Sequence, residues 1–326
     1  MTPHYIDSVI KALNAKSIPK IEYLQELWSG YGEIVRLSLE GADAESVIAK
    51  CVKFGSVKNH PRGWNTKVSH TRKHKSYQVE QAWYKHYSAK CDDFCRVPKF
   101  YSCTIENDGL LLLLEDLKYS GYPLLKSQLT KYELFTCVEW LANFHATFLF
   151  HEPEHIWPKG TYWHLDTRRD EYEAMIDWEV KSIAKDIENR LQACKFQTFV
   201  HGDAKVANFC FSKDSKRVAA VDFQYVGRGC GMKDLAYLMG SCLDEDECFD
   251  WEGEILNHYF ISFEKSVLEK GLNVDLEALE VEWRELFPIA WTDFTRFLLG
   301  WMPGHHKINS YSKMLTKRSV LILNNA

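Results

Sequence analysis

The sequence predicts an α+β protein with two lobes. Strand-like segments dominate the first third of the 326 residues, and helix-like segments dominate the rest. A polar hairpin-like segment lies among the helical segments. A chain of this length exceeds one typical hydrophobic core, so two domains are expected. Strand-rich and helix-rich parts in succession are typical of α+β folds. We place the lobes at residues 1–117 and 118–326.

The N-terminal lobe is expected to be rich in strands. Apolar alternation and short apolar runs predict strands at residues 21–27, 34–40, 46–54, 97–102 and 109–117. Helices are expected at residues 5–15 and 76–87. The second is amphipathic, with Val79 and Trp83 facing inward and Ala82 and His86 as further candidates. Residues 57–75 are basic and contain His, Gly and Asn, which is typical of a loop.

The C-terminal lobe is expected to be mainly helical. Helical periodicity predicts helices at residues 132–150, 170–191, 252–270 and 276–301. Residues 157–164 form an aromatic loop between the first two. Apolar runs at residues 209–212 and 218–221 flank a polar turn, which predicts a β-hairpin.

Composition excludes several classes of protein. The net charge of −5 and the pI near 6.2 argue against nucleic-acid binding by bulk attraction. No apolar run approaches the roughly 18 residues of a membrane span, and no secretory signal is visible at the N-terminus. The ten cysteines lack the spacing of a disulfide framework, which favours reduced thiols. These features predict a cytoplasmic protein without a membrane span.

Three polar residues around the hairpin form the candidate catalytic centre. Asp203 and Asn208 precede the hairpin, and Asp222 follows it, so one rim can hold all three. Asp203 can accept a proton from a substrate hydroxyl. Asn208 and Asp222 can supply oxygen ligands to Mg²⁺, which prefers one or two carboxylate-type contacts plus phosphate oxygens. This division of labour is that of a phosphoryl-transfer site.

Two lysines compete for a role in phosphate binding. The strand at residues 46–54 contains Lys50 and Lys53, whose odd spacing points them to opposite faces. A half-buried ammonium needs a counter-charge or a phosphate, and Glu80 on the following helix is the natural partner for Lys50. The same residues can also be explained without a function. Both lysines could bury only their aliphatic stems, and Glu80 could be an acid in the first helical turn that the helix dipole favours.

The ordered motifs resemble those of a known superfamily. They are His201-Gly202-Asp203, Asn208, Asp222-Phe223-Gln224 and Asp234-Leu235-Ala236-Tyr237-Leu238. This set resembles the aminoglycoside phosphotransferase and choline kinase superfamily, and within it the ecdysteroid kinase-like branch. The resemblance implies a two-lobed, protein-kinase-like fold with ATP and Mg²⁺ as cofactors.

The resemblance also implies a role for each matched residue. Asp203 would be the catalytic aspartate, and Asn208 and Asp222 the Mg²⁺ ligands. Lys50 would contact phosphate with Glu80 as its partner. The remaining assignments are Gly30 and Gly32 in a phosphate loop, Glu115 to Leu117 as the adenine-binding linker, and Asp234 and His201 as braces of the catalytic loop.

The acceptor is expected to be a small-molecule hydroxyl. Only eleven residues separate Asp222 from Asp234, which is too short for a protein-kinase activation segment. Gln224 stands where choline kinases tend to carry an acid, which disfavours choline. Aromatic and acidic side chains of the C-terminal lobe are the candidate pocket residues: Trp163, His164, Asp166, Trp291, Asp293, Trp301 and His305. Two alternatives remain, a catalytically silent nucleotide-binding protein and, less favoured, a protein kinase.

Overall fold

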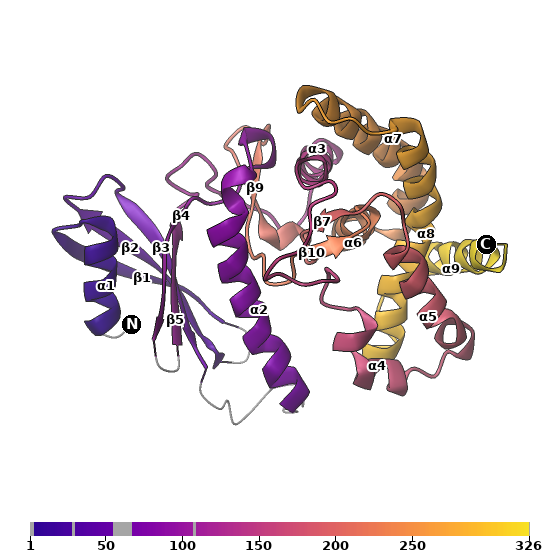
Figure 1. The fold of residues 1–326 in the computed structure, drawn as a ribbon, viewed down its shortest axis with the longest axis horizontal. Helices are drawn as coiled ribbons and strands as arrows, with labels where there is room; N and C mark the ends of the chain where they lie inside the picture. Colours follow the sequence, from indigo (N-terminus) through magenta and orange to yellow (C-terminus); the bar gives the residue numbers. More distant parts are fainter. Residues whose placement is uncertain (1–2, 28–29, 55–66, 107–108, 326) are drawn as a thin grey trace.

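An antiparallel five-stranded sheet with the order β1-β2-β3-β5-β4 forms the first part of the fold. The computed structural model describes residues 3–27, 30–54, 67–106 and 109–325. The strands are β1 (Ser17–Glu26), β2 (Gly32–Glu40), β3 (Ser46–Lys53), β4 (Phe100–Glu106) and β5 (Gly109–Glu115). Helix α1 (Pro3–Leu13) covers one face of this sheet, and helix α2 (Lys67–His86) lies on the other side (Figure 1).

The two faces of β3 have different partners. Val47, Ala49 and Cys51 pack in a cluster with Tyr5 and Val9 of α1. Because side chains alternate along a strand, the residues between them face α2 and the second lobe. Lys50 is one of these, so the strand register aims its side chain at the interior between the lobes.

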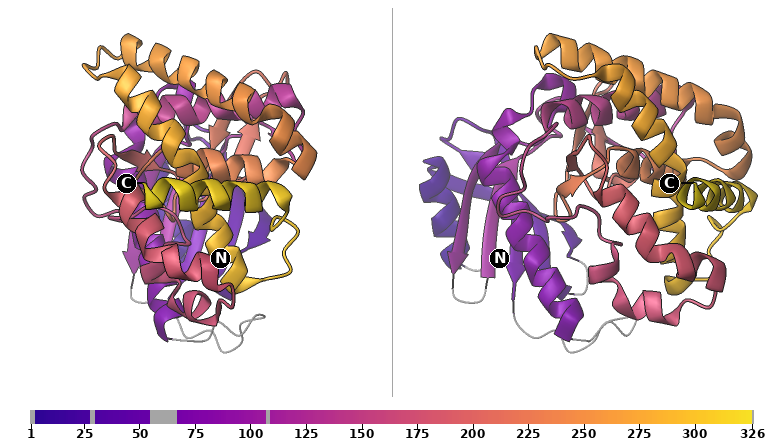
Figure 2. Two further views of the ribbon diagram at one scale, coloured as in Figure 1. Left: turned by 90° about the vertical axis from the view of Figure 1, so that its right-hand side faces the viewer. Right: turned by 45° about the vertical axis from the view of Figure 1, so that its right-hand side comes forward.

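The second part is mainly helical. Its helices are α3 (Lys131–Thr147), α4 (Arg169–Ala174), α5 (Trp178–Gln192), α6 (Met232–Cys242), α7 (Glu245–Glu269), α8 (Leu276–Trp301) and α9 (Ser310–Asn324). Its short strands are β6 (Leu124–Leu125), β7 (Thr198–Val200), β8 (Phe209–Phe211), β9 (Val218–Ala220) and β10 (Gly227–Gly229). Figure 2 shows α7 and α8 enclosing the outer side, away from the five-stranded sheet.

Helix α2 joins the two parts through an aromatic core. The indole of Trp83 stacks on Phe223 with ring centroids 4.5 Å apart, and it contacts Phe148 of the second part at 5.1 Å. Val79 and Trp83 are fully buried, as their spacing predicts. This core holds the Asp222-Phe223-Gln224 segment against α2.

Several expectations from the sequence are wrong in detail. The loop expected at residues 57–75 ends earlier, since α2 already includes Lys67 and residues 55–66 lie outside the described part. The one glycine and both asparagines that favoured a loop precede Lys67, and Lys and Arg are good helix formers. His86 is exposed rather than inward-facing. The strand expected at residues 97–102 spans Phe100–Glu106.

The helix expected at residues 170–191 is broken into α4 and α5. The side chain of Asp177 accepts a hydrogen bond from the Val180 N–H and caps the start of α5. A side chain that satisfies the free N–H groups of a helix start favours a new helix over continuation of the old one. Helices α6 and α9 and strands β6, β7 and β10 have no counterpart in the expected elements. The hairpin is confirmed as β8 and β9.

The structure bears on the expectations about cysteines and membrane spans. All ten cysteines are free thiols. In the part of the chain that the structure describes, no helix combines the length and apolarity needed to cross a bilayer.

The turn before β2 requires a glycine at position 32. The φ angle of Gly32 is +136°, and a Cβ there would stand 1.9 Å from the carbonyl oxygen of Cys51. We therefore expect Gly32→Ala to lower the free energy of unfolding by roughly 2–4 kcal/mol, as measured by urea denaturation. Gly253→Ala is the control, because a Cβ in this exposed turn of α7 meets nothing within 4 Å. An unchanged stability of the Gly32 variant would contradict this account of the turn.

Candidate active site

The loop between β7 and β8 is held by hydrogen bonds to buried side chains. The carboxylate of Asp234, in the first turn of α6, accepts the backbone N–H groups of His201 at 2.5 Å and Gly202 at 2.9 Å. The His201 ring lies 3.0 Å from the Val221 carbonyl oxygen through Nε2, and its Nδ1 accepts the Asp203 N–H. These contacts confirm that Asp234 and His201 brace the loop.

Asp203 is buried and has one oxygen without a hydrogen-bond partner. Its Oδ2 accepts from Lys205 Nζ at 2.9 Å and from Asn208 Nδ2 at 3.1 Å. Its Oδ1 is buried and has no hydrogen-bond partner among the described residues. Burial raises the pKa of Asp203 above its ordinary value; Lys205 opposes this shift and the charge of Asp222 adds to it. A carboxylate in this state is suited to accept a proton.

Asn208 and Asp222 are both neighbours of Asp203. The Asn208 Nδ2 donates to Asp203, which leaves the amide oxygen as the atom that can act as a ligand. Asp222 has a φ of +70°, and its Oδ1 is buried without a hydrogen bond in the described structure. Burial acts to raise the pKa of Asp222, but the charges of Lys50, Lys73 and Lys205 outweigh it and hold the pKa below its ordinary value.

The donor set fits a divalent cation that is shared with a phosphate. One amide oxygen and one ionised carboxylate match the few protein ligands that Mg²⁺ takes beside phosphate oxygens. No group of three or more His, Cys, Asp or Glu side chains suited to a metal occurs among the described residues. The oxygens of Asn208 and Asp222 thus fit the type of ligand that a Mg²⁺ shared with a phosphate would use.

Lys50 and Glu80 form a buried ion pair across the sheet and α2. Lys50 Nζ lies 2.7 Å from Glu80 Oε2 and 3.6 Å from Asp222 Oδ1. Burial acts to lower the pKa of Lys50, but the charges of Glu80 and Asp222 outweigh it and raise the pKa. Lys53 is exposed at the end of β3. The structure therefore brings Lys50, and not Lys53, to the three polar residues.

The glycine turn and the linker offer few free backbone groups. The Gly30 N–H donates to the Leu27 carbonyl, so it is already used within the turn. The Glu115 side chain pairs with Arg96, and the Glu115 N–H donates to the Lys99 carbonyl. The Asp116 and Leu117 N–H groups have no hydrogen-bond acceptor among the described residues, so both remain candidate donors of this linker.

The acceptor candidates fall into two groups. Three are in packed or paired interior positions: Trp163 Nε1 donates to Asp293 Oδ2 at 3.0 Å, and Trp291 Nε1 donates to Ser312 at 2.9 Å. Asp293 is also paired with Arg296 at 2.8 Å. Each of these three side chains therefore already has a hydrogen-bond or ion-pair partner within the protein.

The other candidates lie nearer to solvent or lack partners. Asp166 is exposed and paired with Lys159 at 2.9 Å. Trp301 and His305 are half-buried, and Trp301 stacks on Phe297. Both ring nitrogens of His164 are buried without hydrogen-bond partners among the described residues. Burial, assisted by Lys233, lowers the pKa of His164 to about 3.

Sequence reasoning missed the residues that lie closest to Asp203. Lys205 pairs with its carboxylate, and its position two residues later was the available signal. The hydroxyls of Tyr162 and Tyr237 lie 3.1 Å apart. Burial and the charge of Asp203 raise the pKa of Tyr237, which places this pair beside the carboxylate. Tyr162 belongs to the aromatic loop, and Tyr237 ends the Asp-Leu-Ala-Tyr motif.

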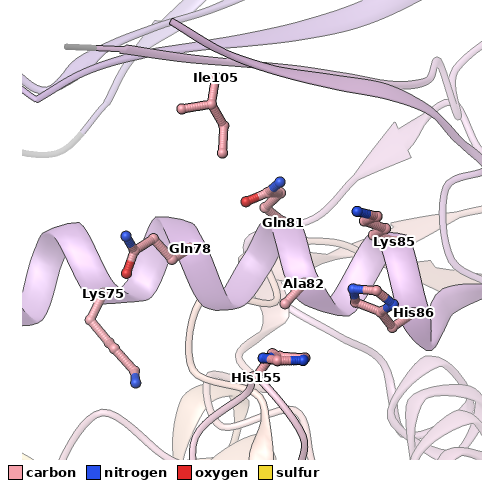
Figure 3. A pocket seen from close by; sticks show the side chains of 8 residues that line it. All are labelled: Lys75, Gln78, Gln81, Ala82, Lys85, His86, Ile105 and His155. Carbon is pink, nitrogen blue, oxygen red and sulfur yellow. The ribbon is translucent and has the colours of Figure 1, made fainter. Parts of the chain in front are cut away.

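A separate pocket occupies the opposite face of α2. It has a volume of about 390 Å³ and is lined by Lys75, Gln78 and Lys85 of α2, together with Ile105 and His155 (Figure 3). It contains none of the polar residues of the candidate centre. It is therefore not the site of the chemistry.

Comparisons with known proteins confirm the superfamily resemblance. The ecdysteroid kinase-like family model matches residues 159–271. The matched segment contains Asp203, Asn208, Asp222 and Asp234. A search of curated protein sequences returned no match.

Solved structures confirm the fold. The chain resembles the GDP complex of wild-type aminoglycoside 2'-phosphotransferase-IIIa, with a TM-score of 0.50, 11% identity and coverage of 99% of this chain and 98% of that one. Two further neighbours are aminoglycoside-3'-phosphotransferase of type VIII (TM-score 0.45, 15% identity, 88% and 99% coverage) and a Plasmodium vivax ethanolamine kinase (TM-score 0.48, 10% identity, 94% and 84% coverage). The protein therefore has a two-lobed, kinase-like α+β fold.

The brace of the loop can be tested by removing one acceptor. Asp234→Asn replaces a carboxylate that accepts two backbone N–H groups with an amide that presents only one oxygen. We expect a loss of about 1–3 kcal/mol in the free energy of unfolding, measured by urea denaturation, because a buried N–H is left unpaired. Asp250→Asn, on the exposed face of α7, is the control and should change it by less than about 0.5 kcal/mol. If the two variants lose equal free energy of unfolding, Asp234 does not hold the loop in the way proposed.

Proposed function

We propose that this protein is an ATP-dependent phosphotransferase that moves the γ-phosphate of ATP to a hydroxyl of a small-molecule acceptor. The buried and unpartnered Oδ1 of Asp203 carries the proposal, because it lies in one centre with Asn208, Asp222 and the Lys50–Glu80 pair. A phosphoryl-transfer site needs a base, metal ligands and a phosphate-binding cation at one place.

Each residue has a separate role in the proposed reaction. Asp203 orients the acceptor hydroxyl and takes its proton as the oxygen attacks the γ-phosphorus, while the bond from that phosphorus to the bridging oxygen of ADP breaks and ADP leaves. Lys50, fixed by Glu80, contacts the phosphates of ATP. Asn208 and Asp222 would hold Mg²⁺, which supplies positive charge that stabilises the transferring phosphate. We also propose the Leu117 N–H as the contact to the adenine edge, and a lobe boundary after residue 117.

The acceptor is proposed to bind on the side of Asp203 that Tyr162 and Tyr237 occupy. The half-buried rings of Tyr162 and Trp301, which pack on the buried cluster of Trp163, Phe294 and Phe297, supply aromatic surface. Such surface binds an acceptor with an apolar or planar body, while the two hydroxyls can contact the reacting group. His164, His305 and Asp166 stay candidates for polar contacts at the rim.

The alternative functions are less well supported. A silent nucleotide-binding protein would not need Asp203 with an unpartnered oxygen beside two metal-ligand oxygens. A protein kinase would need a longer segment between Asp222 and Asp234 than the eleven residues present. The ten free thiols are those expected of a protein from a reducing compartment, and we propose the cytoplasm.

Nucleotide binding is the first test. Mg-ATP at millimolar concentration should raise the melting temperature of the wild-type protein, because a ligand that binds only the folded state stabilises it by mass action. Lys50→Met should reduce this shift far more than Lys53→Met, since Lys50 lies in the centre and Lys53 is exposed. Absence of any shift in the wild-type protein would count against both the active and the silent alternative.

The second test separates the base from the metal ligand. Asp203→Asn preserves shape and should still bind ATP, while transfer falls by about 10²-fold or more, as expected when a positioned general base is lost. Asp222→Ala should instead impair Mg²⁺ dependence and nucleotide binding together. The measurements are an ATP-consumption screen against alcohols, amino alcohols, sugars and sterols, then kinetics and nucleotide titrations on both variants. Turnover of Asp203→Asn near the wild-type rate would refute the assignment of the base.

A further inference from the structure

Helix α2 aims three side chains at the candidate centre. Lys73, Tyr77 and Glu80 are spaced by four and three residues, so they share one face of the helix. Lys50 Nζ lies 5.5 Å from the centroid of the Tyr77 ring, and Lys73 Nζ lies 4.8 Å from the same centroid. One ring therefore lies beside both ammonium groups, which brings Lys73 into the centre that Lys50 occupies.

Lys73 differs from the other two lysines of this centre in its partner. Lys50 is paired with Glu80 at 2.7 Å, and Lys205 with Asp203 at 2.9 Å. The hydrogen-bond partner of Lys73 Nζ is a neutral amide oxygen, Oε1 of Gln224, at 2.7 Å.

No carboxylate neutralises Lys73 at ion-pair distance among the described residues. The undescribed residues 55–66, which precede α2 in the chain, contain no Asp or Glu. Lys73 therefore interacts with Asp222 and Glu80 only at longer range than an ion pair.

Gln224 positions this charge next to the proposed metal ligand. It follows Asp222 by two residues, and its Oε1 also lies 3.1 Å from Ser76 Oγ of α2. A neutral amide fixes the direction of an ammonium group but leaves its full charge for another ligand. A carboxylate at position 224 would instead neutralise Lys73.

The environment of Lys73 favours an anion as that ligand. Burial lowers the pKa of Lys73, whereas the carboxylates around Lys50 outweigh burial and raise the pKa of that lysine. Asp222, Glu80 and Tyr225 offset the desolvation of the Lys73 ammonium only in part, and a bound anion would offset it further. In the proposed function the anion that enters this space is the phosphate chain of the nucleotide.

We propose that Lys73 is a second phosphate-binding lysine, which contacts the polyphosphate chain of the nucleotide from α2 while Lys50 contacts it from β3. Gln224 is its positioning residue. This inference rests on the proposed function, because it needs a nucleotide between the lobes. Lys73 would be a further cation of the site, and it lies outside the sequence motifs.

The test uses the full chain and compares ligands with and without phosphates. Lys73→Met is titrated with Mg-ATP, inorganic tripolyphosphate and adenosine by calorimetry. The loss of one charged contact should weaken ATP and tripolyphosphate roughly 10- to 100-fold and leave adenosine unchanged. Lys73→Arg, which keeps the charge, should retain most of the affinity. Lys75→Met is the matched control, because Lys75 points from the other face of α2 into the pocket of Figure 3, and its ATP affinity should change less than about twofold.

A second variant leaves Lys73 in place. Gln224→Glu is nearly isosteric and puts a carboxylate at the atom that now contacts Lys73 at 2.7 Å. It should weaken ATP roughly tenfold or more by neutralising the lysine, while the melting temperature of the nucleotide-free protein stays the same or rises.

The outcomes separate this inference from the proposed function. Wild-type protein that binds ATP, together with a Lys73→Met variant of equal ATP affinity, overturns the role of Lys73 alone. The same follows if Lys73→Met weakens adenosine as much as ATP, since the lysine would then act only on the fold. Wild-type protein that binds neither ATP nor tripolyphosphate overturns both the inference and the proposed function.

Discussion

The geometry of the candidate centre depends on one buried carboxylate. Asp234 is fully buried, accepts the N–H groups of His201 and Gly202, and lies 3.2 Å from Nε2 of His145 on α3. His145 in turn contacts the hydroxyl of Tyr259 on α7 at 2.7 Å. Helices α3 and α6 and the loop before β8 therefore meet at Asp234, and α7 is joined to them through His145. The loop lacks the regular backbone hydrogen bonds of a helix or a strand. The Asp234 carboxylate instead accepts two of its N–H groups.

Glycine completes this arrangement where side chains have no room. Gly202 has a φ of +79°, and a Cβ there would stand 2.1 Å from the Tyr225 carbonyl oxygen. The loop can thus approach the segment after Asp222 closely enough to bring Asp203 and Asp222 into one centre. The His201 ring, which lies near the Val221 carbonyl, links the same two segments. Backbone proximity, rather than direct side-chain pairing, sets the relation between the two carboxylates.

Helix α2 couples the Lys50 side of the centre to the rest of the molecule. Trp83 packs it against Phe223, and Glu80 fixes Lys50 of β3, so the helix contacts both lobes (Figure 1). The outer face of the same helix carries basic and amide side chains that line a separate pocket. A helix with one apolar face and one charged face toward the centre can position Lys73 and Glu80 only if its rotation is fixed. The stacked aromatic rings provide that restraint.

The sequence alone determined the elements whose signals are local. The alternation in β3, the periodicity of α3 and α8, and the hairpin after Asn208 follow from residue patterns within one element. The motif residues also fixed the order in which Asp203, Asn208 and Asp222 occur. Only the tertiary structure decided which groups meet: that Lys50 rather than Lys53 faces Glu80, that Lys73 reaches Gln224, and that Tyr237 lies beside Asp203. These contacts join residues up to 151 positions apart, and packing between elements, which no local pattern encodes, selects them.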